Sequence, residues 1–346
     1  MRKMYILVAL MVLMICSACT RQNEVYYEKS SIVMDTVVTL SASGENAEKA
    51  VNESFDRLKE LDEMASPTLA DSDVVKINAA AGDHAVKVHP EIYHMLEVSQ
   101  EYSKLTDGAW DATMGPIINL WGIGTDQQKL PLPEEVQAAL KLVGYKDLSL
   151  QEDLNVKLER KGMAVDLGGI AKGYAADEVE KIYQKYQIKN GLINLGSSSM
   201  YALGENKKGK AWNVGIKHPR NDDASVYLAI VGLKDESLST SGDYERFFIQ
   251  DGKRYHHIFD PKTGYPADTG VMNDTIVIDG SIPEGGMLAD LLTTAVFVMG
   301  PEKGRDFLDG LGFAHGEITT TDHLIYTAGG FKTRMMKLHQ DFQFTP

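Results

Sequence analysis

The sequence predicts an α/β (α+β) fold in which helices pack on a largely antiparallel sheet. Two amphipathic helices are expected at 47–64 and 90–105, because apolar residues recur there at helical spacing. After residue 190 the pattern changes to short alternating segments separated by turns, which is typical of antiparallel strands. Between these regions, 165–177 runs from an apolar strand end through a diglycine into a third helix.

The first residues are expected to direct export. A basic start and an apolar run at 5–15, too short to span a bilayer, indicate a signal peptide over 1–18. Ser17 and Ala18 place small residues before Cys19, a pattern that resembles the lipobox at which bacterial lipoproteins are cut and diacylated on the new N-terminal cysteine.

Cleavage before Cys19 would leave it as the only cysteine of the mature chain, which excludes a structural disulfide and a cysteine-based metal site. We then expect an exported protein, lipid-anchored to the outer face of the cytoplasmic membrane or to an outer membrane. Residues 19–30 would be the tether and 31–346 the folded domain. The alternative is that Cys16 and Cys19 are only apolar residues of the signal peptide.

The formal net charge of −14 limits the partners of the protein. An acidic surface repels a phosphate backbone, so nucleic acid is not an expected partner. An anionic ligand must instead be held by local positive charge, by helix ends or by a metal. The composition, 43% hydrophobic and 24% charged, otherwise fits an ordinary globular domain.

The N-terminal half is predicted to contain one strand and two helices. A β-branched, partly alternating segment at 31–40 indicates the strand. The helices at 47–64 and 90–105 each have an apolar face opposed by charged residues. We expect the intervening segment 66–78, rich in Asp and Ser, to be a polar connection.

A motif that combines aromatic, acidic and small residues follows the second helix. Gly108 is placed to end that helix, and Pro116 to open another short one. Between them, the ring of Trp110 and the carboxylate of Asp111 suit a flat aromatic ligand. The alternative is a buried core tryptophan with Asp111 capping a turn.

The diglycine has the features of a phosphate-binding turn. Apolar residues recur at helical spacing after it, so the helix should begin near Gly169 with unpaired amides at its start. Without a Cβ at Gly168 or Gly169 a ligand can approach the backbone closely, and the helix dipole favours an anion. Lys172 would add a positive charge. The alternative is a strand-to-helix turn in which the glycines only ease packing.

Short strands are predicted in the C-terminal half at 192–195, 198–203, 212–217, 226–231, 246–249, 255–258 and 275–278. His256 and His257 are adjacent in one of them and at first suggest a metal site. Because neighbours in a strand point to opposite faces, the two side chains are not expected to bind one ion. We expect one of them to face a site and the other to face solvent.

The last candidate site lies in an apolar helix near Met287. Asp290 and Thr294 are four residues apart, so their oxygens lie on one face of that helix. A carboxylate and a hydroxyl directed together from a buried helix can bind a hard cation such as Mg²⁺. The alternative is that Asp290 caps the helix start while Thr294 bonds back to the preceding turn.

Four segments, in this order, resemble the FAD:protein FMN transferase family, also called the ApbE or thiamine-biosynthesis lipoprotein family. They are Met34-Asp35-Thr36; Gly108-Ala109-Trp110-Asp111 with Gly115-Pro116 and Asn119-Leu120-Trp121-Gly122; 166–177 around the diglycine; and His257-Ile258-Phe259-Asp260-Pro261-Lys262-Thr263-Gly264 with 289–295. The resemblance extends from about residue 32 to residue 300 and implies an ApbE-like fold for the domain at 31–346.

The resemblance implies that FAD is bound as a substrate, with Mg²⁺ beside its pyrophosphate. It implies transfer of FMN to a threonine hydroxyl of an acceptor flavoprotein, such as an FMN-carrying subunit of a redox pump, with release of AMP. The flavin-binding positions of the family match Met34, Ala109, Trp110, Asp111, Asp166, Lys172, His257 and Ile258. Its metal ligands match the Gly169 carbonyl, Asp290 and Thr294.

The predicted catalytic residues are His257 and Asp290. His257 matches the histidine that the family uses in the chemistry, and it is favoured as the general base because an imidazole can accept a proton near neutral pH, whereas Asp290 is occupied by the metal. Two positions depart from the family pattern: Asp35 replaces a common glycine, and Thr68 replaces a tyrosine that packs on the flavin. Flavin stacking is therefore expected to differ.

Two other functions use the same residues. One is a Mg²⁺-dependent FAD pyrophosphatase, in which water replaces threonine and the products are FMN and AMP. The other is a non-enzymatic FAD-binding lipoprotein, which the change at Thr68 favours slightly.

Overall fold

The computed structural model describes residues 25–196, 198–223 and 225–346. A nine-stranded sheet forms the centre, and its neighbouring strands are antiparallel except for the last pair, which is parallel. In sheet order the strands are β1 (Tyr26–Val33), β2 (Thr36–Ser43), β6 (Gly191–Leu195), β7 (Ser199–Leu203), β10 (Glu236–Gly242), β13 (Val271–Asp279), β14 (Ala314–Thr320), β15 (Leu324–Ala328) and β17 (Gln343–Phe344).

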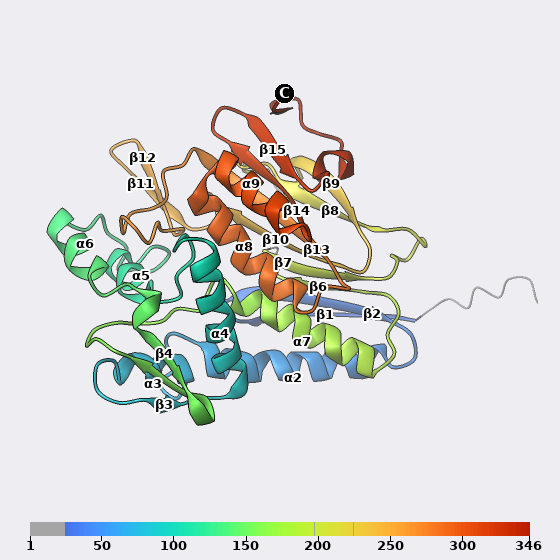
Figure 1. Cartoon of the computed structure of the whole chain (residues 1–346). Coiled ribbons are helices and arrows are strands. Elements are labelled where there is room, and N and C mark those ends of the chain that lie inside the picture. Colours follow the sequence, from blue (N-terminus) through green and yellow to red (C-terminus); the bar gives the residue numbers. More distant parts are fainter. Residues whose placement is uncertain (1–24, 197, 224) are drawn as a thin grey trace, which may run out of the picture.

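Four helices cover one face of this sheet, as Figure 1 shows. The other face is covered by a small three-stranded sheet in the order β16-β9-β8. The four helices are α2 (Ala47–Ala65), α7 (Ala171–Lys185), α8 (Gly285–Met299) and α9 (Pro301–Leu311), and the strands of the small sheet are β8 (Trp212–Lys217), β9 (Tyr227–Leu233) and β16 (Met335–Met336). The predicted α/β architecture with a largely antiparallel sheet is confirmed.

The remaining elements form a lobe at one end of the sheet (Figure 1). It contains α3 (Asp73–Ala79), α4 (Pro90–Leu105), α5 (Gly115–Trp121), α6 (Pro133–Leu140) and the strands β3 (Val86–Lys87), β4 (Leu148–Gln151) and β5 (Asn155–Leu158). A separate hairpin of β11 (Phe247–Gln250) and β12 (Lys253–His256) lies beside α5 and α6 (Figure 1). Three single-turn 3-10 helices complete the chain, η1 (Tyr145–Asp147), η2 (Glu152–Leu154) and η3 (Phe331–Arg334).

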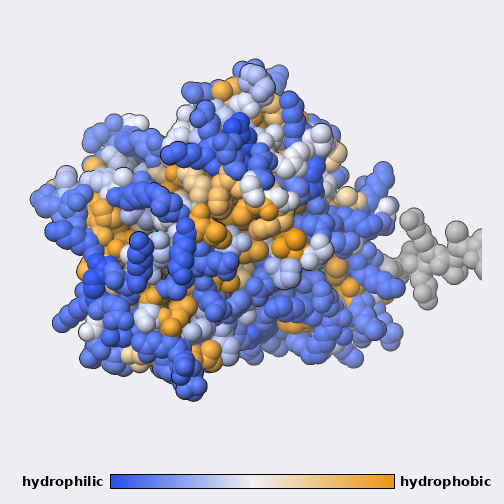
Figure 2. Space-filling view, in the orientation of Figure 1, coloured by the Kyte–Doolittle hydropathy of each residue, from blue (hydrophilic) through white to orange (hydrophobic). Residues whose placement is uncertain are grey.

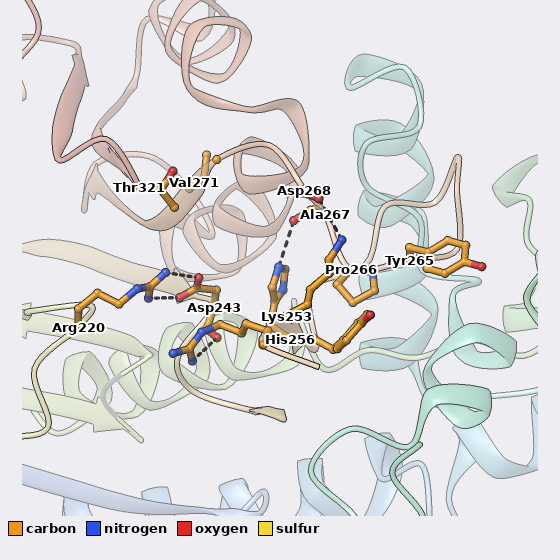
Figure 3. Close-up of a pocket in the computed structure, with 14 residues that line it drawn as sticks. Arg220, Asp243, Lys253, His256, Tyr265, Pro266, Ala267, Asp268, Val271 and Thr321 are labelled. Atoms are coloured by element: carbon orange, nitrogen blue, oxygen red, sulfur yellow. Dashed lines mark hydrogen bonds and ion pairs between the residues drawn. The ribbon is translucent and has the colours of Figure 1, made fainter. Parts of the chain in front are cut away.

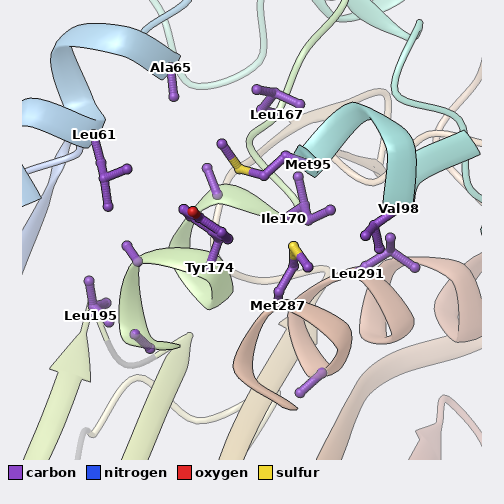
Figure 4. Close-up of a cluster of buried hydrophobic side chains, with 14 of the residues drawn as sticks. Leu61, Ala65, Met95, Val98, Leu167, Ile170, Tyr174, Leu195, Met287 and Leu291 are labelled. Carbon is purple, nitrogen blue, oxygen red and sulfur yellow. The ribbon is translucent and has the colours of Figure 1, made fainter. Parts of the chain in front are cut away.

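The main core lies where the helices meet. Figure 4 shows side chains from α2, α4, α7 and α8 directed toward one another, among them Leu61, Met95, Tyr174 and Met287. Each is buried, because the apolar stripe of each amphipathic helix faces the others. A fully buried side chain of this size contributes about 1.5–3 kcal/mol to folding, so this cluster fixes how the helices cross. On the surface, hydrophobic residues gather in the middle of one face, over α8 and α9, and hydrophilic residues surround them (Figure 2).

Two predictions for the N-terminal part are corrected. The predicted strand at 31–40 is a hairpin, in which Met34 and Asp35 form a two-residue turn between β1 and β2. Both residues have a left-handed φ, of 54° and 56°, the conformation that such a turn requires at both positions. The pattern contains no glycine there, so the turn was missed. In addition, β1 begins at Tyr26, so residues 26–30 belong to the sheet and are not part of the tether.

The segment 66–78, predicted to be a connection, contains helix α3. The Ser72 side chain caps it by accepting a hydrogen bond from the Val75 amide at 3.0 Å. A helix of seven residues is too short to show a clear apolar period, which explains the error. The strand expected to lead into the diglycine is also absent in this part of the chain; Ala164 forms only a single bridge, with Met114.

Other predicted elements are confirmed with small shifts. The helices at 47–64 and 90–105 match α2 and α4, and Pro116 lies in the first turn of α5. Gly108 lies two residues beyond the cap of α4, where its amide donates to the Ser103 carbonyl at 2.8 Å. Helices α6 and α9 and strands β14 to β17 were not predicted.

No helix in the described part of the chain is both long and apolar enough to cross a membrane. The predicted signal peptide at 1–18 and the lipidation site Cys19 lie outside the described residues.

Candidate active site at the crossing of two helices

The diglycine leads into α7 as predicted, and the helix begins at Ala171. The Asp166 carboxylate accepts a hydrogen bond from the Gly168 amide at 2.8 Å, which shapes the turn. Lys172 Nζ donates to the Gly168 carbonyl oxygen at 3.0 Å, so its charge is held over the turn. Hydrogen bonds therefore join Asp166, Gly168 and Lys172 in one turn.

Gly169 lies against two further predicted residues. A Cβ added to it would lie 2.9 Å from Cζ3 of Trp110 and 3.1 Å from Oγ1 of Thr294. Only glycine allows the backbone to come this close, which is a physical reason for the second glycine. The indole Nε1 of Trp110 is buried and has no hydrogen-bond partner within the described chain. The Trp110 atoms that face Gly169, Cζ3 and Cη2, are at the far edge of the six-membered ring, so Nε1 lies at the opposite end of the indole and not against the diglycine turn.

Asp290 also reaches the start of α7. Its Oδ2 accepts a hydrogen bond from the Gly173 amide at 2.9 Å, and its Oδ1 accepts one from the Ser199 hydroxyl at 3.1 Å. It therefore caps α7 and does not cap its own helix, as the alternative prediction had supposed. The side chain is 6% exposed. Asp290 and Thr294 both face the first turns of α7.

The mirror arrangement occurs at the start of α8. The Asp177 carboxylate of α7 accepts hydrogen bonds from the amides of Gly286 and Met287, both at 2.8 Å. Burial raises the pKa of Asp177 to about 7. Gly173 and Gly286 touch at the crossing, since a Cβ on Gly173 would lie 2.1 Å from the Gly286 carbonyl oxygen. Each helix thus supplies the capping carboxylate of the other.

His257 follows the end of β12, on a hairpin that is held against α5. Tyr255 stacks on Phe248 and packs against Trp121, with ring centroids 5.2 and 5.6 Å apart. The Nδ1 atom of His257 lies 3.3 Å from the Arg246 carbonyl oxygen. With Nδ1–H as the donor in that contact, Nε2 keeps a free lone pair.

Electrostatics links His257 to the diglycine turn. Burial, Arg246 and Lys172 lower the pKa of His257 to about 3, so the imidazole is neutral at physiological pH. Burial raises the pKa of Asp166, while Lys172 and Arg246 oppose that rise. The charged groups of the turn and the imidazole therefore lie close enough to influence one another.

The neighbouring His256 has a different environment. Its ring is buried, packs edge-on against Phe297, and donates from Nε2 to the Ala267 carbonyl oxygen at 3.1 Å. The two histidines thus have separate surroundings. Strand β12 ends at His256, so His257 lies outside the strand in which both were predicted, and the expectation that the other histidine faces solvent is wrong, because the His256 ring is buried.

Other predicted flavin residues are less directly engaged. Both oxygens of Asp111 are occupied within the protein, by the Thr113 amide and hydroxyl and by the Tyr145 amide. This is the turn-capping alternative. Ala109 and Ile258 are buried.

Met34 lies in the β1–β2 turn. Its amide donates to the Asp62 carboxylate at 3.2 Å. No described contact joins Met34 or Asp111 to the diglycine turn. Thr68, at the predicted stacking position, is exposed just beyond the end of α2.

Sequence reasoning missed Asp177, Ser199 and Arg246. A signal for the first was available, because α7 and α8 share a Gly-x-x-x-Asp pattern, Gly173 with Asp177 and Gly286 with Asp290. Glycine and aspartate four residues apart lie on one helical face, so two such helices can meet at the glycines and cap each other. Nothing in the sequence alone indicated that Ser199 would reach Asp290.

The oxygen donors present fit Mg²⁺. A carboxylate, a hydroxyl and a backbone carbonyl are hard ligands of the kind that this ion prefers. Thr294 lies against the Gly169 backbone, and Asp290 keeps lone pairs beyond its two hydrogen bonds. The neighbouring helix start and Lys172 suit the phosphates that usually complete a magnesium site.

Comparisons with known proteins agree with this geometry. Residues 34–314 match the ApbE family. The chain is 34% identical to the FAD:protein FMN transferase of Klebsiella pneumoniae over 80% of this chain and 84% of that protein, and 33% identical to that of Treponema pallidum over 83% and 82%.

Solved structures agree as well. The crystal structure of the ApbE protein from Thermotoga maritima superposes with a TM-score of 0.81 at 34% identity, covering 90% of this chain and 100% of that one. The flavin transferase ApbE from Vibrio cholerae gives a TM-score of 0.79 at 28% identity, covering 90% and 99%. The chain is a transferase that belongs to the ApbE family.

Proposed function

We propose that the protein is a Mg²⁺-dependent FAD:protein FMN transferase that moves FMN from FAD to a threonine hydroxyl of an exported acceptor protein and releases AMP. The observation that carries this proposal is the meeting of Gly169, Trp110 and Thr294 beside the carboxylate of Asp290. It combines a helix start, the edge of a buried indole ring and hard oxygen ligands in one place. The names of the relatives support the FAD substrate and the protein acceptor.

The diglycine turn would bind the pyrophosphate of FAD. The amides of Ala171 and Gly173 are paired within the protein, so the dipole of α7 and the ammonium of Lys172 would attract the negative charge. The lack of a Cβ at Gly168 and Gly169 would let the phosphates approach. The Gly169 carbonyl, Asp290 and Thr294 would hold Mg²⁺, which when bound neutralises charge on the pyrophosphate.

His257 would act as the general base, with the negative charge of the bound pyrophosphate raising the pKa of its imidazole from about 3 toward neutrality. The threonine oxygen forms a bond to the FMN-side phosphorus, the bond from that phosphorus to the AMP oxygen breaks, and the hydroxyl proton passes to Nε2 of His257. Its Nδ1–H contact with the Arg246 carbonyl oxygen fixes the tautomer that this transfer needs. Positioning and electrostatics carry most of the rate in such a reaction.

A direct assay tests this proposal. Purified protein is mixed with FAD, Mg²⁺ and a candidate acceptor protein that carries an exposed threonine segment. Covalent FMN on the acceptor, detected by mass and in-gel fluorescence, is the expected result, together with one AMP per FMN. Soluble FMN alone would identify a pyrophosphatase, and intact FAD would identify a binding protein; either result would contradict the proposal.

We also propose export and lipid anchoring, with cleavage after residue 18 and acylation of Cys19. Because the predicted site residues begin only at Met34, Cys19→Ala should release the protein from the membrane fraction and leave FMN transfer in vitro unchanged. Two or more acyl chains would account for stable anchoring without a basic surface. A Cys19→Ala protein that stays in the membrane fraction after a high-salt wash would refute this part of the proposal.

A further inference from the structure

A cavity of about 410 Å³ lies on one side of the β11–β12 hairpin, apart from the predicted flavin residues. Figure 3 shows His256 and Ala267 on its inner side, with Arg220 and Asp243 at one end and Tyr265 at the other. His256 lines the cavity, and the next residue is His257, the proposed base. The cavity and the site thus share one hairpin.

The charges that line this cavity leave one cation without a carboxylate partner. Arg220 binds Asp243 through two hydrogen bonds of 2.6 Å, and Lys253 pairs with Asp268 at 3.2 Å. These two pairs balance, and the lining His256 is kept neutral because burial lowers its pKa. Arg254 is the remaining charged group of the lining.

The Arg254 guanidinium is held in place, but most of its N–H donors lack a partner among the described residues. Its guanidinium lies over the Phe247 ring, 3.7 Å from the centroid, and one long hydrogen bond of 3.4 Å joins it to the Asp243 backbone carbonyl. No ion pair to Arg254 is present among the described residues. A guanidinium has five N–H donors in a planar fork that matches a carboxylate, so most of its donors are available to a ligand.

The same face of the hairpin carries exposed apolar side chains. Phe247 pairs with His256 in the ladder and Ile249 pairs with Arg254, so all four point to one side. Ile249 is 61% exposed and Phe247 36%. A ligand that contacts them must therefore offer apolar groups as well as an anion.

We propose that this cavity binds an acidic side chain of the acceptor protein, and so positions the acceptor for transfer. The proposal rests on the proposed FMN transfer. Carboxylate is the chemical class that Arg254 recognises, and a protein segment supplies the apolar contacts for Phe247 and Ile249 that a small free carboxylate lacks. His256, which lines the cavity, is adjacent in the chain to His257, so the cavity lies beside the segment that carries the proposed base.

Steady-state kinetics of Arg254→Gln tests this assignment. Loss of a charge-assisted hydrogen bond should raise the KM for the acceptor about tenfold, while the dissociation constant for FAD stays unchanged. Arg254→Lys keeps the charge and should recover part of the affinity. Arg305→Gln is the matched control, because Arg305 is a surface arginine on α9 beside Asp306, and it should behave as wild type. Circular dichroism verifies that each variant folds.

Two further arms identify the ligand. Replacing acidic residues beside the acceptor threonine should raise the KM of wild type as Arg254→Gln does, and the two changes together should add little more. Acetate competing with the acceptor at millimolar concentration, with no effect of the acceptor's acidic residues, would assign the cavity to free carboxylates and overturn the proposal. An unchanged acceptor KM in Arg254→Gln would also overturn it.

This failure can be told apart from failure of the proposed function. If wild type transfers FMN and Arg254→Gln does so with the same KM, only the docking site is wrong. If wild type transfers nothing, fluorescence anisotropy of a labelled acceptor binding to the full chain still reports on the cavity: Arg254→Gln should weaken that binding about tenfold. Equal binding by wild type and Arg254→Gln would reject the site by itself.

Discussion

Helices α7 and α8 each begin with a capping carboxylate from the other helix, and the two carboxylates differ in their hydrogen-bond partners. Asp177 accepts from two backbone amides of α8, whereas Asp290 accepts from one amide of α7 and from the Ser199 hydroxyl. Backbone amides cannot turn away from their acceptor. A hydroxyl can rotate, and Ser199 has a second neighbour in Ser239, at 3.3 Å.

The two starts also differ in what precedes them. The start of α7 follows the exposed Gly168 and the partly buried Gly169, while α8 follows Glu284, which pairs with His94 at 2.7 Å. The same capping pattern thus occurs at the proposed ligand site, the start of α7, and beside an ion pair, at the start of α8. The difference lies in the partner of the second carboxylate oxygen and in the loop before the helix, and both can be tested.

The largest expected effect comes from replacing the two carboxylates in parallel. Asp290→Asn keeps an acceptor for the Gly173 amide but loses the negative charge that Mg²⁺ requires, so FMN transfer should fall about 100- to 1,000-fold. Asp177→Asn should change kcat less than about threefold, because it has no ligand role. Initial rates at saturating FAD and Mg²⁺ measure both. Equal losses in the two variants would show that the two carboxylates have the same role.

The second largest effect is expected at Gly173 and Gly286, the glycines where α7 and α8 cross. Gly173→Ala would place a Cβ 2.1 Å from the Gly286 carbonyl oxygen and force the helices apart, at a cost of about 3 kcal/mol of folding free energy. Gly286→Ala should cost a similar amount, since its Cβ would lie 2.7 Å from the Gly173 carbonyl oxygen. Urea denaturation measures both.

A matched control for these variants lies in α9. Gly310 is helical and has open space where a Cβ would be, so Gly310→Ala should leave stability unchanged or raise it by about 0.5–1 kcal/mol. If Gly173→Ala proved as harmless as Gly310→Ala, the close contact of α7 and α8 would not be what holds the crossing together.

The two starts should also differ in their response to pH. Burial raises the pKa of Asp177 from 3.8 to about 7, so the folded state holds a proton that the unfolded state releases between these values. The stability that this proton contributes is present below about pH 4 and lost as pH rises to 7. Asp177→Asn removes the titrating group and should flatten the decline in unfolding free energy between pH 4 and 7. If the unfolding free energy of Asp177→Asn fell as steeply between pH 4 and 7 as that of wild type, Asp177 would not be the group that titrates in this range.

A second buried acid serves as a check on that experiment. Burial also raises the pKa of Glu317 to about 7, in a position on β14 away from the helix crossing. Glu317→Gln should flatten the decline in the same window, and the double variant should flatten it further, because the two sites share no described contact.

Most helices and the sheet could be predicted from the sequence, whereas several residues around the candidate site could not. Apolar residues recur at helical spacing over several turns in α2, α4 and α7, which made these helices predictable. The alternation of apolar and polar residues after residue 190 predicted the sheet. The turn at Met34 and Asp35 was missed because neither residue is glycine, although both adopt a left-handed φ. Short elements such as α3 carry too few residues for a period to emerge.

The site could be predicted where chemistry and spacing lie within one segment. Local geometry places Lys172 over Gly168, and it places Asp290 and Thr294 on one face of α8. The contact of Ser199 with Asp290 joins positions 91 residues apart and depends on how β7 packs under α8. Such contacts arise from tertiary packing, for which a single sequence gives no direct signal.

Ser199 gives the smallest and sharpest test of the comparison. Ser199→Ala removes one hydrogen bond to Asp290 Oδ1 and leaves the Gly173 contact in place, so stability should fall by about 1 kcal/mol. If Asp290 binds a metal, its carboxylate will also be less well oriented, and the Mg²⁺ concentration for half-maximal transfer should rise about tenfold. Saturating Mg²⁺ should then restore the wild-type rate, which a purely structural role for Ser199 does not predict. A reduced rate that excess Mg²⁺ leaves unchanged would place Ser199 with Asp177, among the groups that only hold the helices together.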